Sequence, residues 1–232
     1  MTEKYAVLAL GCHKGADYQL NHVIVPLDGS KYQVTTALPL TVEKVDKLVI
    51  GSLPGDKAIV AIKTRFYNNA AIYLIDASDN LVSDLGGLTV SGVDALDFVP
   101  YDSGAVLLSA NYADIALKAT YFDSEAKIVK TETVEIEDNK YDITRIDCQN
   151  TTCGFSTSSN VIFISKMISK NSELEVQNLT FFNSIQYTKR SPKLTAGKEF
   201  LAYHMESAEG PITVIYSFSY PTGAFGSISL GT

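Results

Sequence analysis

The stretch that decides the fold is Val45-Asp-Lys-Leu-Val-Ile-Gly-Ser-Leu-Pro-Gly-Asp-Lys-Ala-Ile-Val-Ala-Ile62. It contains two short apolar runs, Lys47–Ile50 and Ala58–Ile62, and they flank a turn that contains Pro and Gly. Runs of this length that are rich in Val and Ile and end at turn residues are typical of β-strands. The stretch therefore predicts two neighbouring strands joined by a turn.

Similar runs occur along the whole chain, bounded by Gly, Pro, Asn, Asp or Ser. They are Tyr5–Leu10, Val23–Leu27, Ala71–Ile75, Val106–Ala110, Ile115–Phe122, Val161–Ile164, Leu174–Phe181, Phe200–Tyr203 and Thr213–Phe218. No amphipathic stripe of helical period with caps at both ends accompanies them. The sequence therefore predicts an all-β protein.

An internal repeat organises these strands. Asp46, Asp94 and Asp142 each follow an apolar or aromatic residue and precede a strand-like run, at intervals of 48 residues. A second strand follows at the same interval in four units: Ala58–Ile62, Val106–Ala110, Gly154–Ser158 and Ala202–Met205. A third strand, a polar turn and a fourth strand complete each unit. The repeat predicts a four-stranded antiparallel meander of 48 residues.

A unit of this size and strand count resembles a blade of the β-propeller superfamily. The resemblance covers the chain and reaches no named family, since Gly86-Gly87 is similar to the kelch double glycine but occurs only once. It implies one propeller domain of five blades, at about residues 1–42, 43–91, 92–140, 141–186 and 187–232. A pair of β-sandwiches is the rival fold, and the constant interval argues against it.

The first unit has room for only three strands, because nothing remains before Lys4 to form an inner strand. Three explanations stay open: a ring closed around a three-stranded blade, a strand supplied by another chain, or a chain cut from a longer propeller. If another chain supplies the strand, Ala6–Gly11 would accept it and Phe225–Thr232 would donate it. That exchange predicts head-to-tail oligomers or filaments.

The repeated Asp has two readings. Acids near inner strands can ring a central channel, where five-bladed glycosidases place catalytic carboxylates. Alternatively, each carboxylate accepts hydrogen bonds from nearby backbone amides and holds a turn between blades. We favour the structural reading, because a catalytic pair needs two different environments rather than one copied environment. The fourth equivalent position is Arg190, which breaks the series.

Cys148 and Cys153 lie four residues apart in a predicted hairpin, where facing cross-strand positions are within disulfide reach. A disulfide between them would indicate an oxidising compartment, whereas two buried thiols would suit a reducing one. Cys12 would then be the odd thiol. A zinc site that combines Cys12 and His13 with this pair fits no standard ligand spacing.

Two Asn residues, Asn150 and Asn178, begin N-glycosylation sequons, although about two sequons are expected by chance in a chain of this composition. Asn150 lies at the tip of the predicted disulfide hairpin. Together with that disulfide, it favours an extracellular or cell-surface protein. Met1–Lys4 lacks the features of a signal peptide.

Composition and motifs narrow the function classes. A net charge of -7 without basic clusters argues against nucleic-acid binding, and no apolar run is long enough for a membrane helix. No catalytic, nucleotide-binding or metal-binding motif occurs, so we expect no enzymatic activity, no cofactor and no metal. His13, His22 and His204 fall in unrelated contexts.

Two functions remain as predictions. The first is a structural or adhesive module that binds protein partners, with self-association into filaments. The second is a propeller lectin that uses tyrosines near strand ends to bind a glycan, although the chain has no Trp. These tyrosines are Tyr67, Tyr101, Tyr112, Tyr187 and Tyr203.

Overall fold

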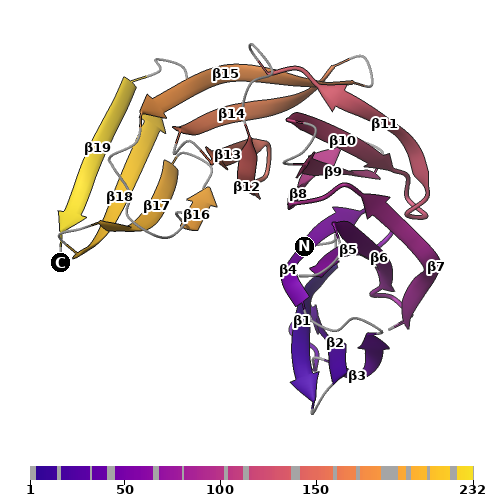
Figure 1. Cartoon of the computed structure of the whole chain (residues 1–232). Coiled ribbons are helices and arrows are strands. Elements are labelled where there is room, and N and C mark those ends of the chain that lie inside the picture. The colour runs from indigo at the N-terminus through magenta and orange to yellow at the C-terminus, as the bar shows by residue number, and fades with distance from the viewer. Residues whose placement is uncertain are drawn as a thin grey trace. The chain divides into compact units, whose positions relative to one another are not determined.

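The structure is a computed structural model of the whole chain (Figure 1). It describes the backbone of residues 4–231 except 15–16, 32, 41–44, 65–67, 80, 102–103, 112–114, 137–141, 159–160, 171–172, 184–192, 197–199, 208–209 and 220–223. Side chains are described in fewer places, and none after residue 176. Within these ranges the regular structure is entirely β, so no helix there could span a membrane.

The strands form five antiparallel sheets in chain order. The first sheet holds β1 (Tyr5–Lys14), β2 (Asp17–Pro26) and β3 (Gln33–Leu40). The second holds β4 (Val45–Leu53), β5 (Lys57–Thr64), β6 (Asn69–Asp76) and β7 (Leu81–Ser91). The third holds β8 (Ala95–Tyr101), β9 (Gly104–Asn111), β10 (Ala116–Phe122) and β11 (Ile128–Val134). The fourth holds β12 (Ile143–Gln149), β13 (Thr152–Thr157), β14 (Val161–Lys170) and β15 (Glu173–Asn183). The fifth holds β16 (Lys193–Ala196), β17 (Phe200–Ser207), β18 (Gly210–Ser219) and β19 (Ala224–Gly231).

The predicted repeat is confirmed. The second strands of the four-stranded sheets start at Lys57, Gly104, Thr152 and Phe200, in steps of 47, 48 and 48 residues. Each of these sheets is a simple meander in which neighbours in sequence are neighbours in the sheet. The first sheet has three strands, and its β1 takes the place that a second strand takes elsewhere. The missing inner strand of the first unit was therefore predicted correctly.

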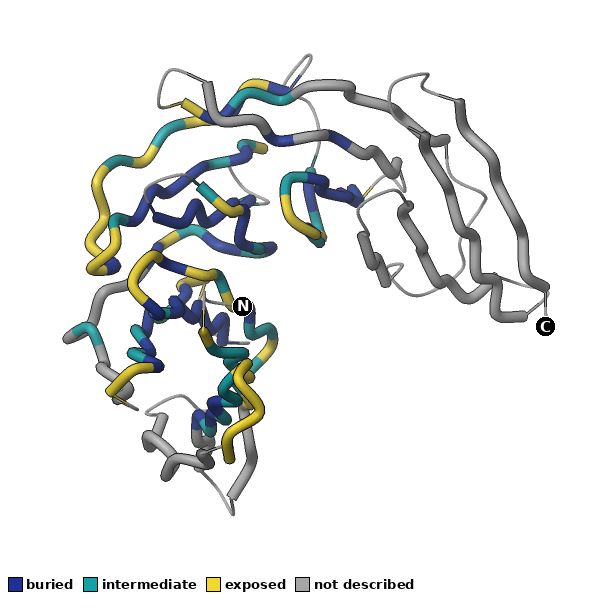
Figure 2. Tube along the Cα trace, turned by 180° about the vertical axis from the view of Figure 1, so that it is seen from behind, coloured by how far each residue is buried: buried dark blue, intermediate teal, exposed yellow. Residues whose placement is uncertain are grey.

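The second strands are the most buried, which explains their nearly continuous apolar sequence. Seven of the eight residues of β5 are buried, as are seven of eight in β9 and all six of β13 (Figure 2). A strand that is covered on both faces cannot alternate apolar with polar residues. The outer strand β11 alternates instead, and Val129 is 66% exposed.

The described residues form two compact units. The first consists of residues 1–93, 100–107 and 120–131, and the second of 94–99, 108–119 and 132–232, so the division runs through the third sheet. The domain boundaries themselves stay a prediction.

The core of the first unit joins its first two sheets. Leu20 and Ile24 of β2 cluster with Val60 and Ile62 of β5 and with Tyr73 of β6. Three residues on one side of β1 pack against this cluster: Tyr5, Val7 and Ala9. Burial of such side chains stabilises the unit by about 1.5–3 kcal/mol for each large aliphatic residue.

Candidate functional site

The first strand of each four-stranded sheet starts where the second strand ends, because neighbouring strands run antiparallel. In the second sheet Val45 pairs with Thr64, and in the fourth Ile143 pairs with Thr157. Asp46, Asp94 and Asp142 lie at this edge of the second, third and fourth sheets. We call the edge the carboxylate edge; each sheet is described separately.

In the second sheet the carboxylate edge holds an ion pair. Oδ2 of Asp46 lies 2.8 Å from Nζ of Lys63 in β5. The Lys63 side chain is only 9% exposed, whereas that of Asp46 is 49% exposed. A bulge between Val45 and Lys47 interrupts the pairing at Asp46. A buried ammonium group requires such a partner, so this pair is structural.

In the fourth sheet the carboxylate meets a hydroxyl group. Oγ of Ser158 donates to Oδ2 of Asp142 over 2.9 Å, and the Ser158 amide donates to the Asp142 carbonyl over 3.0 Å. Ser158 is exposed and Asp142 is half-buried. A carboxylate beside a hydroxyl at a surface is accessible to a bound molecule.

In the third sheet the backbone repeats the arrangement. The Asp94 amide donates to the Ala110 carbonyl over 2.7 Å. Asn111 follows Asp94 by 17 residues, as Lys63 follows Asp46, while Ser158 follows Asp142 by 16.

The repeat therefore copies the carboxylate and changes the residue facing it. We expected backbone amides to be the partners of these carboxylates; the structure instead gives Asp46 an amine and Asp142 a hydroxyl. The three environments differ, so the argument against chemistry from a copied environment does not hold.

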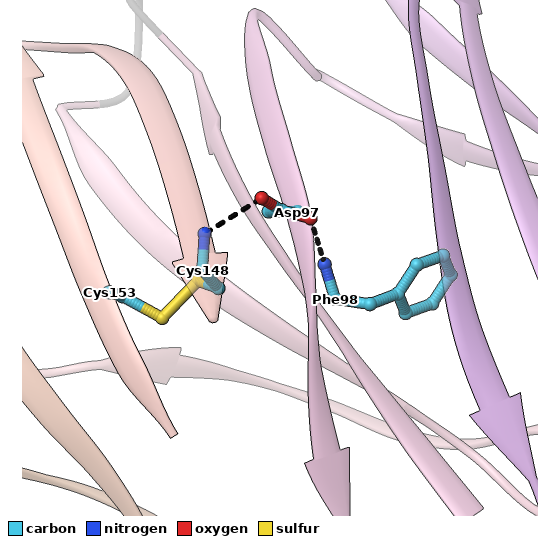
Figure 3. Close-up of a disulfide and its surroundings, with 4 residues drawn as sticks. All are labelled: Asp97, Phe98, Cys148 and Cys153. Atoms are coloured by element: carbon cyan, nitrogen blue, oxygen red, sulfur yellow. Dashed lines mark hydrogen bonds between the residues drawn. A yellow bond between two sulfur atoms is a disulfide. The ribbon is translucent and has the colours of Figure 1, made fainter. Parts of the chain in front are cut away.

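The expected disulfide is present in the structure. Cys148 of β12 and Cys153 of β13 are direct cross-strand partners with Cα atoms 4.1 Å apart, and their sulfur atoms are bonded (Figure 3). Asn150 lies in the turn of this hairpin with φ of 53°, a conformation that Asn tolerates better than most residues. It is exposed, as a glycosylation site requires, but its modification stays a prediction.

Asp97 connects this hairpin to the third sheet, and sequence reasoning missed it. Its Oδ2 accepts the amide of Cys148 over 2.8 Å and its Oδ1 accepts the amide of Phe98 over 2.8 Å (Figure 3). The equivalent positions 48 residues away are Val49 and Arg145, so the repeat contains no signal for this contact.

A second series of aspartates was also missed, although its spacing could have revealed it. Asp28, Asp76 and Asp123, at intervals of 48 and 47 residues, begin the turns before the last strands of the first three sheets. In each turn the Oδ1 atom accepts the amide two residues later, from Ser30, Ser78 and Glu125 respectively. Aspartate favours such turns because its side chain can cap the local backbone.

These turn contacts also shift acidity. The hydroxyl of Ser30, followed by its amide, lowers the pKa of Asp28. Partial burial raises the pKa of Asp76, but hydrogen bonds from Ser78 and from the Asp79 amide outweigh it, so that the pKa is lowered overall.

Other predicted residues are dispersed or lie outside the described parts. His22 is buried in β2, and Tyr101 packs edge-on against Tyr121 with ring centroids 5.2 Å apart. The side chains of Asn178, Cys12, His13 and His204, together with all of Tyr67, Tyr112, Tyr187 and Thr232, lie outside the described residues. Ala6 and Gly11 lie in β1 and Phe225 in β19. Among the described side chains no cluster could hold a metal ion.

No protein-family model and no curated protein matches the chain. Solved structures do match, and they show that the fold is a β-propeller. One is named a putative 6-phosphogluconolactonase from Bacteroides uniformis: 9% identity, TM-score 0.63, over 99% of this chain and 69% of that one. A periplasmic gluconolactonase of Pseudomonas aeruginosa matches with 12% identity and TM-score 0.52, over 98% of this chain and 66% of its own. Prp20p of Saccharomyces cerevisiae, described for its binding to Gsp1p and histones, matches with 9% identity and TM-score 0.51, over 94% and 59%.

The comparison contradicts two expectations. The prediction of a non-enzymatic adhesive module that forms filaments is wrong, because two of the similar structures bear lactonase names and nothing supports adhesion, filaments or glycan binding. The prediction of no enzymatic activity is wrong for the same reason. A propeller can assemble a site from residues of different blades, so the absence of a short local motif does not argue against catalysis.

Proposed function

We propose that the protein is a hydrolase that opens a sugar lactone, a cyclic ester, at the carboxylate edge of the fourth sheet. The observation that carries the proposal is the half-buried carboxylate of Asp142 beside the exposed hydroxyl of Ser158. The likeness to two propellers with lactonase names supports the choice of substrate class.

The reaction needs few groups. A water oxygen bonds to the lactone carbonyl carbon, the bond from that carbon to the ring oxygen breaks, and the ring oxygen takes a proton. Asp142 removes the proton from the attacking water, as a general base does. The Ser158 hydroxyl holds the Asp142 carboxylate in place, and the product is an open-chain hydroxy acid. Asp46 suits this role less, because the ammonium group of Lys63 occupies one of its oxygens.

Proton release from gluconolactone at constant pH, measured against the spontaneous reaction in the same buffer, tests the proposal. We expect the protein to accelerate ring opening and Asp142→Asn to lower the rate about 100-fold or more. Asp79→Asn, an exposed carboxylate in the β6–β7 turn, is the matched control and should keep the rate within about twofold. No acceleration with lactones of five- and six-membered rings would overturn the proposal, and an unchanged Asp142→Asn rate would remove Asp142 from it.

Binding to a protein partner is the second candidate. It is supported by the likeness to Prp20p, whose described property is binding to Gsp1p and histones. The outer strand β11 exposes Ile128 and Val129 beside Lys130, a surface suited to a protein contact. A Val129→Glu variant that loses a partner captured by the wild type would support this candidate.

We also propose that the protein works in an oxidising compartment, outside the cell or at its surface. The support is the disulfide between Cys148 and Cys153, which a reducing cytosol would not maintain. Non-reducing peptide mapping of protein from its native source tests this placement; two free thiols there would overturn it.

A further inference from the structure

The first sheet differs from the other four in one respect. Each of the others begins with a strand that pairs with its second strand, whereas no described strand pairs with the outer side of β1. The strand β1 is nevertheless long, at ten residues, and pairs with β2 along its whole length without a bulge. It therefore presents a regular open edge.

The direction of the backbone groups on this edge follows from the ladder. The Leu27 amide donates to the Lys4 carbonyl over 2.8 Å, so the carbonyl of Lys4 points toward β2. In an antiparallel pair, residues that bond to the partner alternate with residues that point away. Because the register is continuous, Val7, Ala9 and Gly11 direct their amides and carbonyls toward the open edge.

The start of β1 is held firmly. The Lys4 amide donates to Oδ1 of Asp56 over 3.0 Å, and the Lys4 ammonium group lies 3.7 Å from Oδ2. Asp56 is 8% exposed, and its carbonyl accepts the Ala77 amide over 2.9 Å. These contacts tie β1 to the second sheet, so a ligand strand would meet a prearranged edge.

The side chains beside this edge are apolar on both faces. Val7 and Ala9 pack against the core cluster, whereas Leu8 and Leu10 on the opposite face are 52% and 50% exposed. A strand laid along β1 would cover part of the surface of these two leucines. Exposed leucines beside an open strand edge favour a partner that is itself an apolar strand.

The chain's own strands are already paired. β19, expected as the donated strand, pairs with β18 from Ala224 opposite Ser219 to Gly231 opposite Ile212. Its release would break eight residue pairs. The occupant of the edge of β1 must therefore come from elsewhere.

We propose that the open edge of β1 binds an extended apolar segment of a partner protein, which adds antiparallel to β1 as the fourth strand of the first sheet. The strands β4, β8 and β12, seven to nine residues long, take this place in their sheets and indicate the length and apolar character of the segment. The proposal is independent of lactone hydrolysis.

The test uses labelled synthetic peptides with the sequences of Val45–Leu53 and Asp94–Tyr101, and a shuffled version of each, with binding measured by fluorescence anisotropy. We expect the native-order peptides to bind and the shuffled ones to bind at least about tenfold more weakly. Ala9→Pro removes an amide that points to the open edge, where proline is tolerated, and should weaken binding about tenfold. Ala9→Ser keeps the amide and is the matched control.

Peptides that are N-methylated at alternate residues repeat the test without altering the protein. Methylation on the side facing β1 should abolish binding, and methylation one residue away should not. Equal binding of native and shuffled peptides, or of both methylated forms, would overturn the proposal. Concentration-dependent dimers of the free protein that Ala9→Pro abolishes would also overturn it, because the occupant would then be a second copy.

Discussion

The carboxylate of Asp97 accepts the Cys148 amide over 2.8 Å, which connects β8 of one sheet to β12 of the next within the second compact unit. The two residues are 51 positions apart in sequence. The disulfide hairpin is therefore fixed at one side by a covalent bond within its own sheet and at the other by a carboxylate from the preceding sheet.

Replacing Asp97 with Ala should lower the free energy of unfolding by about 1–3 kcal/mol, because the amides of Phe98 and Cys148 both lose their acceptor. Urea denaturation followed by fluorescence measures the loss. Asp79→Ala, at an exposed turn position, is the control. Equal stability of the two variants would mean that water replaces the carboxylate without cost.

Replacing both Cys148 and Cys153 with Ser should reduce stability by about 2 kcal/mol, since the disulfide closes only a short loop. Thermal unfolding with and without reductant measures the effect. Reductant should lower the Tm of the wild type and leave the double variant unchanged. A reductant effect of the same size on the double variant would contradict the prediction.

The ion pair at the carboxylate edge of the second sheet predicts unequal effects of its two residues. Asp46→Ala leaves the buried ammonium group of Lys63 without its carboxylate and should lower stability by about 1–3 kcal/mol. Lys63→Met keeps the aliphatic volume and removes the buried charge, so it should be nearly neutral. Denaturant titration of both variants and of the double variant gives the coupling. A larger loss for Lys63→Met than for Asp46→Ala would contradict this explanation.

The turn aspartates predict a dependence of stability on acid pH. The folded state lowers the pKa of Asp28 and Asp76 below the model value of 3.8, so their contribution is present above that value and is lost as the pH falls through the folded pKa. The Tm of the wild type should therefore fall below about pH 4. The double variant Asp28→Asn with Asp76→Asn should show a flatter acid limb. An acid limb of unchanged slope would assign the loss to other carboxyl groups.

The strands and their repeat could be predicted from the sequence, because both depend on local patterns. Apolar runs such as Ala58–Ile62 and Val106–Ala110 recur at one interval, and the burial of β5 and β9 follows from their nearly uniform apolar character. The three-stranded first sheet follows from the same arithmetic. Even the disulfide could be inferred, since the facing positions of a short hairpin are close by construction.

Only the tertiary structure decided which partner each carboxylate has. Asp46, Asp94 and Asp142 are equivalent in sequence, yet the first faces the ammonium group of Lys63 and the last the hydroxyl of Ser158. Asp97 has no counterpart in the repeat and bonds across to the next sheet. A period in sequence specifies where a strand lies, whereas a hydrogen bond depends on which side chains reach each other once the sheets have packed. For that reason the fold could be read from the chain, and the candidate site could not.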